Sequence, residues 1–328
     1  MNLDGIKFIA KNLHKPNYLL YRLNYRYSPQ LKLKTPVDVT LELASVCNQS
    51  CNYCYHADQE NLPFKKGIMK YETAEKIILE AAKIGVHSIK FNGKGESTIN
   101  KDFHKITTLA KSLARGSTFI DRLTNSNFKF ATSREDIFQG LCNQTKVKIS
   151  FDSFDPEVME KQRAGSIHAL AMKNIDYFYN HPNRKNTEIV IQAVRTKLNL
   201  NEDIEGQVKK RWPSAGVSIR NMVGGRVNAD LTALEHTKRD DSERQSCIQA
   251  HARLIFNWDG KANACCPDIR EELVMGHIKD NSVKEIFNSI YAKSLRGDLK
   301  SQAAFLSDPC KGCSSYETFK GYKAPWNS

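Results

Sequence analysis

The chain has 328 residues, of which 49 are Lys or Arg and 36 are Asp or Glu, so its formal net charge is +13. This length suits one large α/β domain with a small appendage. No apolar run approaches the roughly 18 residues that a membrane span needs, and the N-terminal residues lack the unbroken apolar region of a secretory signal, so we expect a cytoplasmic protein with no membrane partner.

The basic charge is spread along the chain instead of being concentrated in one tail. It permits an anionic substrate or a nucleic acid without establishing either. Near the N-terminus, residues 17–34 interleave aromatic residues with arginines, as a surface that stacks on nucleic acid would. Leu19, Leu20, Leu23 and Tyr27 fall at helical spacing, however, and favour a helix that covers the bottom of the main domain.

Strand and helix patterns then alternate along the chain. We expect strands at 37–44, 87–92, 119–125, 146–152, 188–195 and 216–223, and helices at 71–85, 102–115, 134–142, 156–180 and 202–211. This alternation predicts parallel strands joined by right-handed crossovers. The unusual residues follow the strand ends, which favours a barrel over an open sheet, because barrel active sites form at that rim.

The predicted fold is therefore α/β, a partial (β/α)6 TIM-like barrel with a small C-terminal domain. The expected boundaries are an N-terminal extension at 1–36, the barrel at 37–223, a linker at 224–246 and the small domain at 247–328.

Nine cysteines in a chain with no secretory signal argue against a disulfide framework and for metal or redox chemistry. Cys47, Cys51 and Cys54 share the loop after the first predicted strand. A structural zinc site needs four ligands, with His56 the near candidate for the fourth, whereas three thiolates on a four-iron cluster leave one iron open. The spacing alone does not distinguish a zinc site from an iron–sulfur cluster. Cys142 stands alone in an apolar stretch, where we expect it in the core.

A second group of cysteines lies in the C-terminal region, at Cys247, Cys265, Cys266, Cys310 and Cys313. Between them we predict a β-hairpin that turns at Asp259-Gly260 and an amphipathic helix over 282–296. Four cysteines with this spacing suit zinc or an iron–sulfur cluster, and the spacing alone does not exclude zinc.

The loop "LELASVCNQSCNYCYH" (41–56) resembles the cluster-binding loop of the radical SAM superfamily. The resemblance implies that Cys47, Cys51 and Cys54 bind a 4Fe-4S cluster whose open iron takes the amino and carboxylate groups of S-adenosylmethionine. The segment "GKGES" (93–97) is similar to the family's glycine-rich GGEP segment, with Lys94 between the glycines and Ser97 in place of proline. "KISFDSFDPEVMEKQRAG" (148–165) is similar to the family's fourth strand and following helix.

These matches imply which residues surround S-adenosylmethionine. Tyr53 would lie beside the adenine, the glycine-rich segment beside the methionine amino group, and Arg163 on the methionine carboxylate. The implied set is Tyr53, Gly93, Lys94, Gly95, Glu96, Asn125, Ser150, Asp152 and Arg163. Asp155, just before Pro156, is instead expected to cap the helix that follows.

The C-terminal cysteines resemble the twitch domain, the shortened relative of the SPASM domain. This implies one auxiliary 4Fe-4S cluster bound by Cys247, Cys265, Cys310 and Cys313, with Cys266 as the alternative to Cys265. The implied cofactors are S-adenosylmethionine and two 4Fe-4S clusters, and the implied partner is a reductant such as flavodoxin or ferredoxin.

By this resemblance the protein is an oxidoreductase that cleaves S-adenosylmethionine to a 5′-deoxyadenosyl radical, removes a substrate hydrogen and passes an electron to the auxiliary cluster. A small substrate such as a sugar, aminocyclitol or nucleotide is favoured. The alternatives are crosslinking, epimerisation, isomerisation or oxidation of a peptide, protein or nucleic acid and, from another class, a non-catalytic zinc-binding protein. Arg195, Arg220 and Arg226 are candidates for binding an anionic or hydroxyl-rich substrate, although solvated loop edges also carry such charges.

Overall fold

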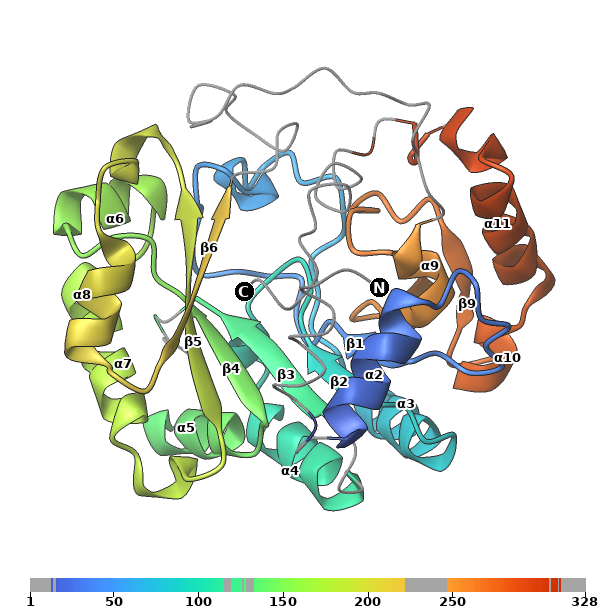
Figure 1. The fold of residues 1–328 in the computed structure, drawn as a ribbon, viewed down its shortest axis with the longest axis horizontal. Coiled ribbons are helices and arrows are strands. Elements are labelled where there is room, and N and C mark those ends of the chain that lie inside the picture. Colours follow the sequence, from blue (N-terminus) through green and yellow to red (C-terminus); the bar gives the residue numbers. More distant parts are fainter. Residues whose placement is uncertain are drawn as a thin grey trace.

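The computed structural model describes residues 13, 16–114, 119–125, 127, 133–221, 247–306, 308–311 and 313. One nine-stranded sheet in the order β6-β5-β4-β3-β2-β1-β7-β8-β9 runs through the molecule (Figure 1). Its strands are β1 Asp38–Leu41, β2 Ser88–Phe91, β3 Phe119–Thr124, β4 Lys146–Ser150, β5 Glu188–Arg195, β6 Gly216–Asn221, β7 Arg253–Phe256, β8 Lys261–Asn263 and β9 Val274–His277.

The first six strands pair in parallel, as the alternating pattern predicts, and form the expected partial barrel. The C-terminal hairpin extends the same sheet, because β7 pairs in parallel with β1, while β8 and β9 add antiparallel strands. The hairpin turns at Asp259-Gly260 as predicted, with Gly260 in the left-handed region that favours glycine (φ 93). The small C-terminal module is thus joined to the barrel through backbone hydrogen bonds.

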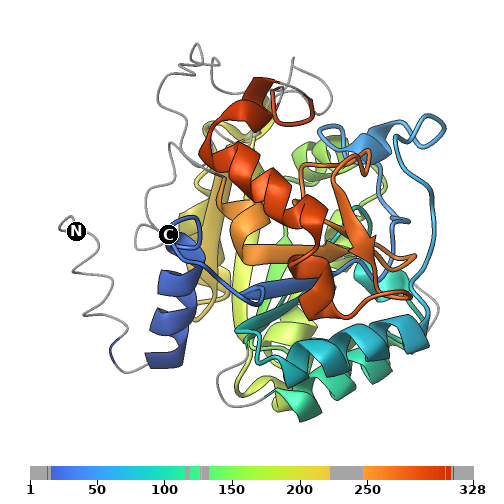
Figure 2. The same cartoon turned by 90° about the vertical axis from the view of Figure 1, so that its right-hand side faces the viewer.

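Helices lie along the outer face of the barrel, and those of the C-terminal module lie near β7, β8 and β9, at the end of the sheet opposite β6 (Figures 1 and 2). None of the helices in the described ranges is long and apolar enough to cross a membrane. Their bounds are α2 Pro16–Arg26, α3 Tyr71–Lys83, α4 Phe103–Leu113, α5 Arg134–Cys142, α6 Pro156–Gln162, α7 His168–Tyr179, α8 Ile204–Arg211, α9 Ile248–Ala252, α10 Val283–Phe287 and α11 Ile290–Lys300.

The first barrel strand separates an apolar face from a polar one. On β1, Val39 and Leu41 belong to the main apolar core, whereas Asp38 and Thr40 lie on the opposite face. Cys142 is buried at the end of α5, as expected, with its Sγ 3.5 Å from Nδ1 of His181. The outer core therefore stabilises the barrel and leaves its interior lined with polar groups.

Two predicted helices are each broken into two. The helix expected over 156–180 ends at Gln162 and restarts at His168, because Arg163 turns inward and Gly165 takes a left-handed conformation (φ 83). The helix expected over 282–296 breaks at Ser289, whose hydroxyl accepts a hydrogen bond from Ala292 N–H and so caps a new helix, α11. Asp155 caps α6 as predicted, through hydrogen bonds to two backbone N–H groups.

Helix α2 confirms the predicted N-terminal helix, but its contacts come from tyrosines instead of leucines. Tyr21 is buried and stacks on Phe119, with ring centroids 5.7 Å apart, while Leu20 is exposed. The Tyr21 hydroxyl also accepts a hydrogen bond from Lys90 at 3.0 Å. The aromatic residues of this helix therefore pack against the start of the strands.

Below these tyrosines lies a buried charge cluster at the start of β1. Asp38 forms ion pairs with Lys90 of β2 and with Arg253 of β7, the latter at 3.3 Å. Burial opposes ionisation of Asp38, but Arg253 and Lys90 outweigh it and hold the pKa of this carboxyl below its usual value. The cluster joins the barrel to the strand that opens the C-terminal module.

Candidate iron–sulfur and cofactor site

The three cysteines of the first loop are held together between β1 and the 3₁₀ turn Tyr55–Ala57. Cys54 N–H donates to the Cys51 carbonyl at 2.9 Å, and Cys51 is buried. Burial raises the pKa of Cys47 to about 12, with Glu96 and the two other thiols adding to the shift. Burial also raises the pKa of Cys51, to about 11, against the opposing charge of Arg163. Clustered thiols of this kind become thiolates when a cation binds them, which fits an iron–sulfur ligand set.

Side chains from two other segments of the barrel approach two of these sulfur atoms. Asn125, just after β3, directs its amide nitrogen to the Cys47 Sγ at 3.7 Å. Arg163, just after α6, directs Nη1 to the Cys51 Sγ at 3.8 Å. Hydrogen bonds of this kind orient metal ligands and tune a cluster. The structure thus places both predicted residues beside the cysteine loop.

Asp152 is the hub of this site. Its carboxylate lies 2.8 Å from Arg163 Nε and accepts hydrogen bonds from Arg163 Nη2 at 3.0 Å, Tyr53 OH at 2.7 Å and Gln162 Nε2 at 2.9 Å. The Val194 N–H donates to it as well, at 2.9 Å. In this structure Asp152 and Arg163 bind each other and the cysteine loop, and their contacts with S-adenosylmethionine remain predictions.

The glycine-rich segment is held against the cysteine loop. A Cβ on Gly95 would lie 2.2 Å from the Val46 carbonyl oxygen, so only glycine fits there. Glu96 N–H donates to the same carbonyl at 2.9 Å, and the Glu96 carboxylate accepts from Asn125 N–H at 2.8 Å. Gly93 is packed as tightly against Glu42, whose Cγ lies 2.4 Å from a Cβ built at that glycine.

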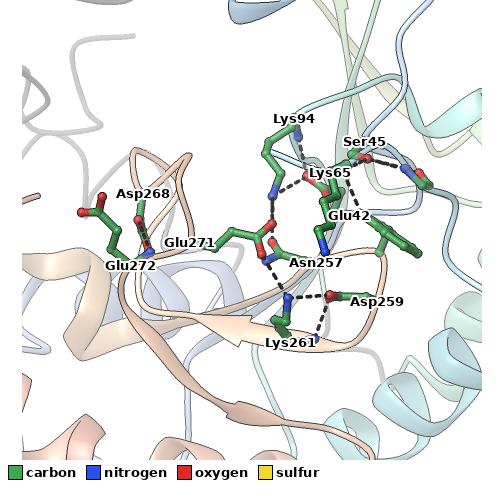
Figure 3. Close-up of polar contacts among 12 residues, drawn as sticks. Glu42, Ser45, Lys65, Lys94, Asn257, Asp259, Lys261, Asp268, Glu271 and Glu272 are labelled. Atoms are coloured by element: carbon green, nitrogen blue, oxygen red, sulfur yellow. Dashed lines mark hydrogen bonds and ion pairs between the residues drawn. The ribbon is translucent and has the colours of Figure 1, made fainter. Parts of the chain in front are cut away.

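Lys94 points away from this loop. Its side chain runs toward Glu42, Asn257 and Glu271, the last two in the C-terminal module (Figure 3). Burial raises the pKa of Glu42, and the Lys94 charge opposes that rise. Sequence reasoning missed Glu42, Asn257 and Glu271, because nothing in the local pattern shows that segments more than 160 residues apart meet here.

The remaining predicted residues are spread over the barrel. Ser150 is buried at the end of β4. Arg195, at the end of β5, donates from Nη1 to the carbonyls of Leu200 and Glu202 at 3.3 and 3.0 Å, which stabilises the following turn. Arg220 is exposed on β6, and Arg226 lies outside the described residues.

The thiols of the predicted C-terminal ligands influence one another's pKa values. Burial raises the pKa of Cys247 to about 12, and the thiols of Cys310 and Cys313 raise it further. Burial raises the pKa of Cys265 strongly, with Cys247 the next contributor. Cys266 is exposed, which favours Cys265 as the ligand; the ligand set remains a prediction. The segment 247–314 matches the SPASM family, described as an iron–sulfur cluster-binding domain.

Among the described residues, no three His, Cys, Asp or Glu side chains are arranged to hold a single metal ion. A four-iron cluster presents a separate iron to each thiolate, so its ligands need not converge on one point. The two cysteine groups have the donor type that such clusters use.

Curated relatives match part of the chain. The GTP 3′,8-cyclase of Actinobacillus succinogenes is 28% identical over 169 residues, which is 49% of this chain and 46% of that protein. The probable GTP 3′,8-cyclase of Methanosarcina mazei is 31% identical over 123 residues, or 37% of this chain and 34% of that protein. The matches thus span less than half the length of these relatives.

Solved structures share the fold over most of the chain. BtrN in complex with AdoMet and 2-DOIA has a TM-score of 0.56 at 15% identity, covering 84% of this chain and 92% of that one. SuiB of Streptococcus suis has a TM-score of 0.61 at 15% identity, covering 82% and 68%. The structure of anSMEcpe with bound AdoMet has a TM-score of 0.59 at 16% identity, covering 87% and 88%.

The fold is the one that these solved structures share, and residues 247–314 match the SPASM family of iron–sulfur cluster-binding domains. Together with the partial match to the GTP 3′,8-cyclases, these findings support a protein similar to the radical SAM proteins that carry a SPASM or twitch domain. This similarity implies S-adenosylmethionine and two 4Fe-4S clusters as cofactors.

Proposed function

We propose that the protein is a radical SAM oxidoreductase that oxidises a small molecule and uses its C-terminal cluster as the electron acceptor. The observation that carries the proposal is the pair of cysteine groups, three on the barrel loop and four in the module attached to it. Three ligands leave an iron free for S-adenosylmethionine, whereas four close a cluster and suit it to electron transfer.

The cofactors would supply a 5′-deoxyadenosyl radical at the first site and a one-electron acceptor at the second. The substrate would lose one hydrogen atom to that radical, which leaves as 5′-deoxyadenosine, and then one electron to the acceptor and one proton to solvent. Flavodoxin or ferredoxin is the proposed donor of the electron that cleaves S-adenosylmethionine.

The protein's own residues would hold this site rigid. The Asp152 carboxylate binds Arg163 and accepts a hydrogen bond from the hydroxyl of Tyr53, which belongs to the cysteine loop. The carboxylate of Glu96, in the glycine-rich segment, accepts a hydrogen bond from Asn125 N–H. Such preorganised polar contacts fix the geometry that a reactive intermediate needs.

The barrel interior supports an anionic group on the substrate. Burial lowers the pKa of Lys148 on β4, and Arg220 and Lys146 lower it further, while Asp121 opposes the shift. Lys148, Lys146 and Arg220 outnumber the one carboxylate among these groups, Asp121, and such an excess of cations favours a carboxylate or phosphate. Lys146 already has Glu188 as an ion-pair partner at 3.1 Å, which leaves Lys148 and Arg220 as the proposed anion-binding pair.

The first test is anaerobic reconstitution of the full chain, followed by an iron count and an assay for 5′-deoxyadenosine. We expect about eight irons per chain and cofactor cleavage after reduction. Zinc binding with neither iron uptake nor cleavage would establish the zinc-binding alternative instead.

The substrate class is tested with deuterated candidates, by following deuterium into 5′-deoxyadenosine. We expect transfer from a sugar, aminocyclitol or nucleotide, and Lys148→Met should raise KM for an anionic substrate about 10-fold with little change in kcat. Lys146→Met is the matched control. Transfer only from a peptide, protein or nucleic acid would establish the polymer alternative, which the fold shared with SuiB and anSMEcpe keeps open.

A further inference from the structure

Each polar group of Lys94 contacts a different part of the molecule. Its N–H donates to Glu42 Oε2 at 2.7 Å, after β1. Its carbonyl oxygen lies 3.0 Å from His56 Nε2, in the turn that follows Cys54. Its Nζ donates to Asn257 Oδ1 and to Glu271 Oε1, both at 3.1 Å, in the C-terminal module (Figure 3). One residue of the glycine-rich segment therefore touches the barrel, the first cysteine loop and the C-terminal module.

These contacts are buried and specific. The Lys94 side chain is 7% exposed, and its Nζ also lies 3.4 Å from Glu42 Oε2. A carbonyl can only accept, so His56 must donate from Nε2, and its Nδ1 lies 3.2 Å from the Gln59 Nε2 donor. A buried ammonium needs its partners, which fixes the path of the lysine.

The partner Glu271 belongs to an ordered segment that begins at Cys265. The Asp268 N–H donates to the Cys265 thiol, and the Asp268 carboxylate accepts from Glu272 N–H at 2.9 Å and Leu273 N–H at 2.8 Å. Glu271 itself has φ 59, a left-handed conformation that is unfavourable for a residue with a side chain. Such strain persists only where surrounding contacts impose it.

Contacts and short chain segments thus connect the second cysteine group to the first. They run from Cys265 through Asp268, whose carbonyl accepts from Glu271 N–H at 3.4 Å, to Lys94 and then to His56, two residues after Cys54. We propose that Lys94 is a positioning residue that couples the C-terminal module to the S-adenosylmethionine site by holding the glycine-rich segment in place. Lys94 stands between Gly93 and Gly95, where the similar GGEP segment has adjacent glycines. Its side chain binds the C-terminal module.

The test measures S-adenosylmethionine binding to the reconstituted full chain by equilibrium dialysis, with no substrate present. Lys94→Met should weaken binding about 10-fold, and Lys94→Arg should recover part of the loss. Glu271→Gln should weaken binding about 3-fold, and adding it to Lys94→Met should cause no further loss, because both changes break one contact. With S-adenosylmethionine bound, the spectrum of the first cluster should change more in Lys94→Met than in Glu271→Gln.

Lys261→Met is the matched control. Lys261 also faces Glu271, with its Nζ 3.6 Å from Oε2, but it is 41% exposed and also pairs with Asp259, outside the glycine-rich segment. The proposal would be overturned if Lys94→Met or Glu271→Gln bound S-adenosylmethionine with wild-type affinity. It would also be overturned if the double variant lost the product of the two single losses in affinity, or if Lys261→Met lost as much affinity as Lys94→Met. If Lys94→Met takes up no iron, Glu271→Gln alone decides. A failed search for a small-molecule substrate leaves these measurements unaffected.

Discussion

The two cysteine groups are built in different ways. Cys47, Cys51 and Cys54 share one loop of eight residues. Two distant side chains, Asn125 after β3 and Arg163 after α6, reach two of their sulfur atoms. The second group draws its cysteines from the start of α9, the end of β8 and the 310–313 turn, and hydrogen bonds from backbone N–H groups reach Cys247 and Cys265.

This difference matches the chemistry proposed for each group. A site that must orient a cofactor needs side chains fixed around a compact loop, whereas a closed cluster mainly needs its ligands held in place. Four sets of variants test this difference between the two groups, and they follow in decreasing order of expected effect.

The largest effect should come from the cysteines themselves. Replacing Cys47, Cys51 and Cys54 by alanine should abolish 5′-deoxyadenosine formation, by at least about 10³-fold, and leave about four irons per chain. Replacing Cys310 and Cys313 should also leave about four irons but preserve cleavage of S-adenosylmethionine.

Cys142→Ala is the matched control for both cysteine variants, because this buried thiol belongs to neither group. Loss of cleavage from both multiple variants would show that the two groups do not have separate roles. Iron content and cleavage assays make the measurement.

Arg163→Met should be the next most damaging change. It leaves Asp152 buried without its cation, and breaking a buried pair in this way costs about 3–5 kcal/mol of unfolding free energy. Urea unfolding of the metal-free chain measures the loss. Arg163→Lys should recover less than half of it, because Asp152 is contacted by two guanidinium nitrogens. A loss below about 1 kcal/mol for Arg163→Met would contradict the assigned pairing.

Asp38 tests the junction between the barrel and the C-terminal module. Asp38→Asn should cost about 3 kcal/mol at pH 7, because it leaves Lys90 and Arg253 without a carboxylate. The folded pKa of Asp38 is depressed, so its contribution is complete above the unfolded value of about 3.9 and disappears as pH falls through the folded value. The difference between the two proteins in urea should therefore shrink below about pH 4; a constant difference would refute this pairing.

Substitutions at two glycines should have the smallest effects on stability, and each should affect the spectrum of a different cluster. Gly165→Ala and Gly260→Ala should each cost about 1–2 kcal/mol, because both glycines have left-handed φ values of 83 and 93. Gly165 faces the first cysteine loop, with a Cβ 3.2 Å from the Asn48 carbonyl oxygen, so its variant should disturb the first cluster's spectrum. Gly260 lies in the hairpin turn, and its variant should disturb the second. The prediction would be contradicted if the Gly165 variant changed only the second cluster's spectrum and the Gly260 variant only the first.

The sequence by itself determined the features that depend on local spacing. Alternating apolar residues located the six barrel strands, and the spacing of Cys47, Cys51 and Cys54 within one loop identified the first site. The hairpin turn and the cap at Asp155 could be predicted because their hydrogen bonds join neighbouring residues.

The tertiary structure decided what depends on segments far apart in the chain. It paired β7 with β1, which lie more than 200 residues apart, and so made the small module an extension of the barrel sheet. It broke the helix over 156–180, because Arg163 finds Asp152 only once β4 and the cysteine loop are in place. It also turned Lys94 toward Glu271, since the side chain follows whichever partner can neutralise it when it is buried.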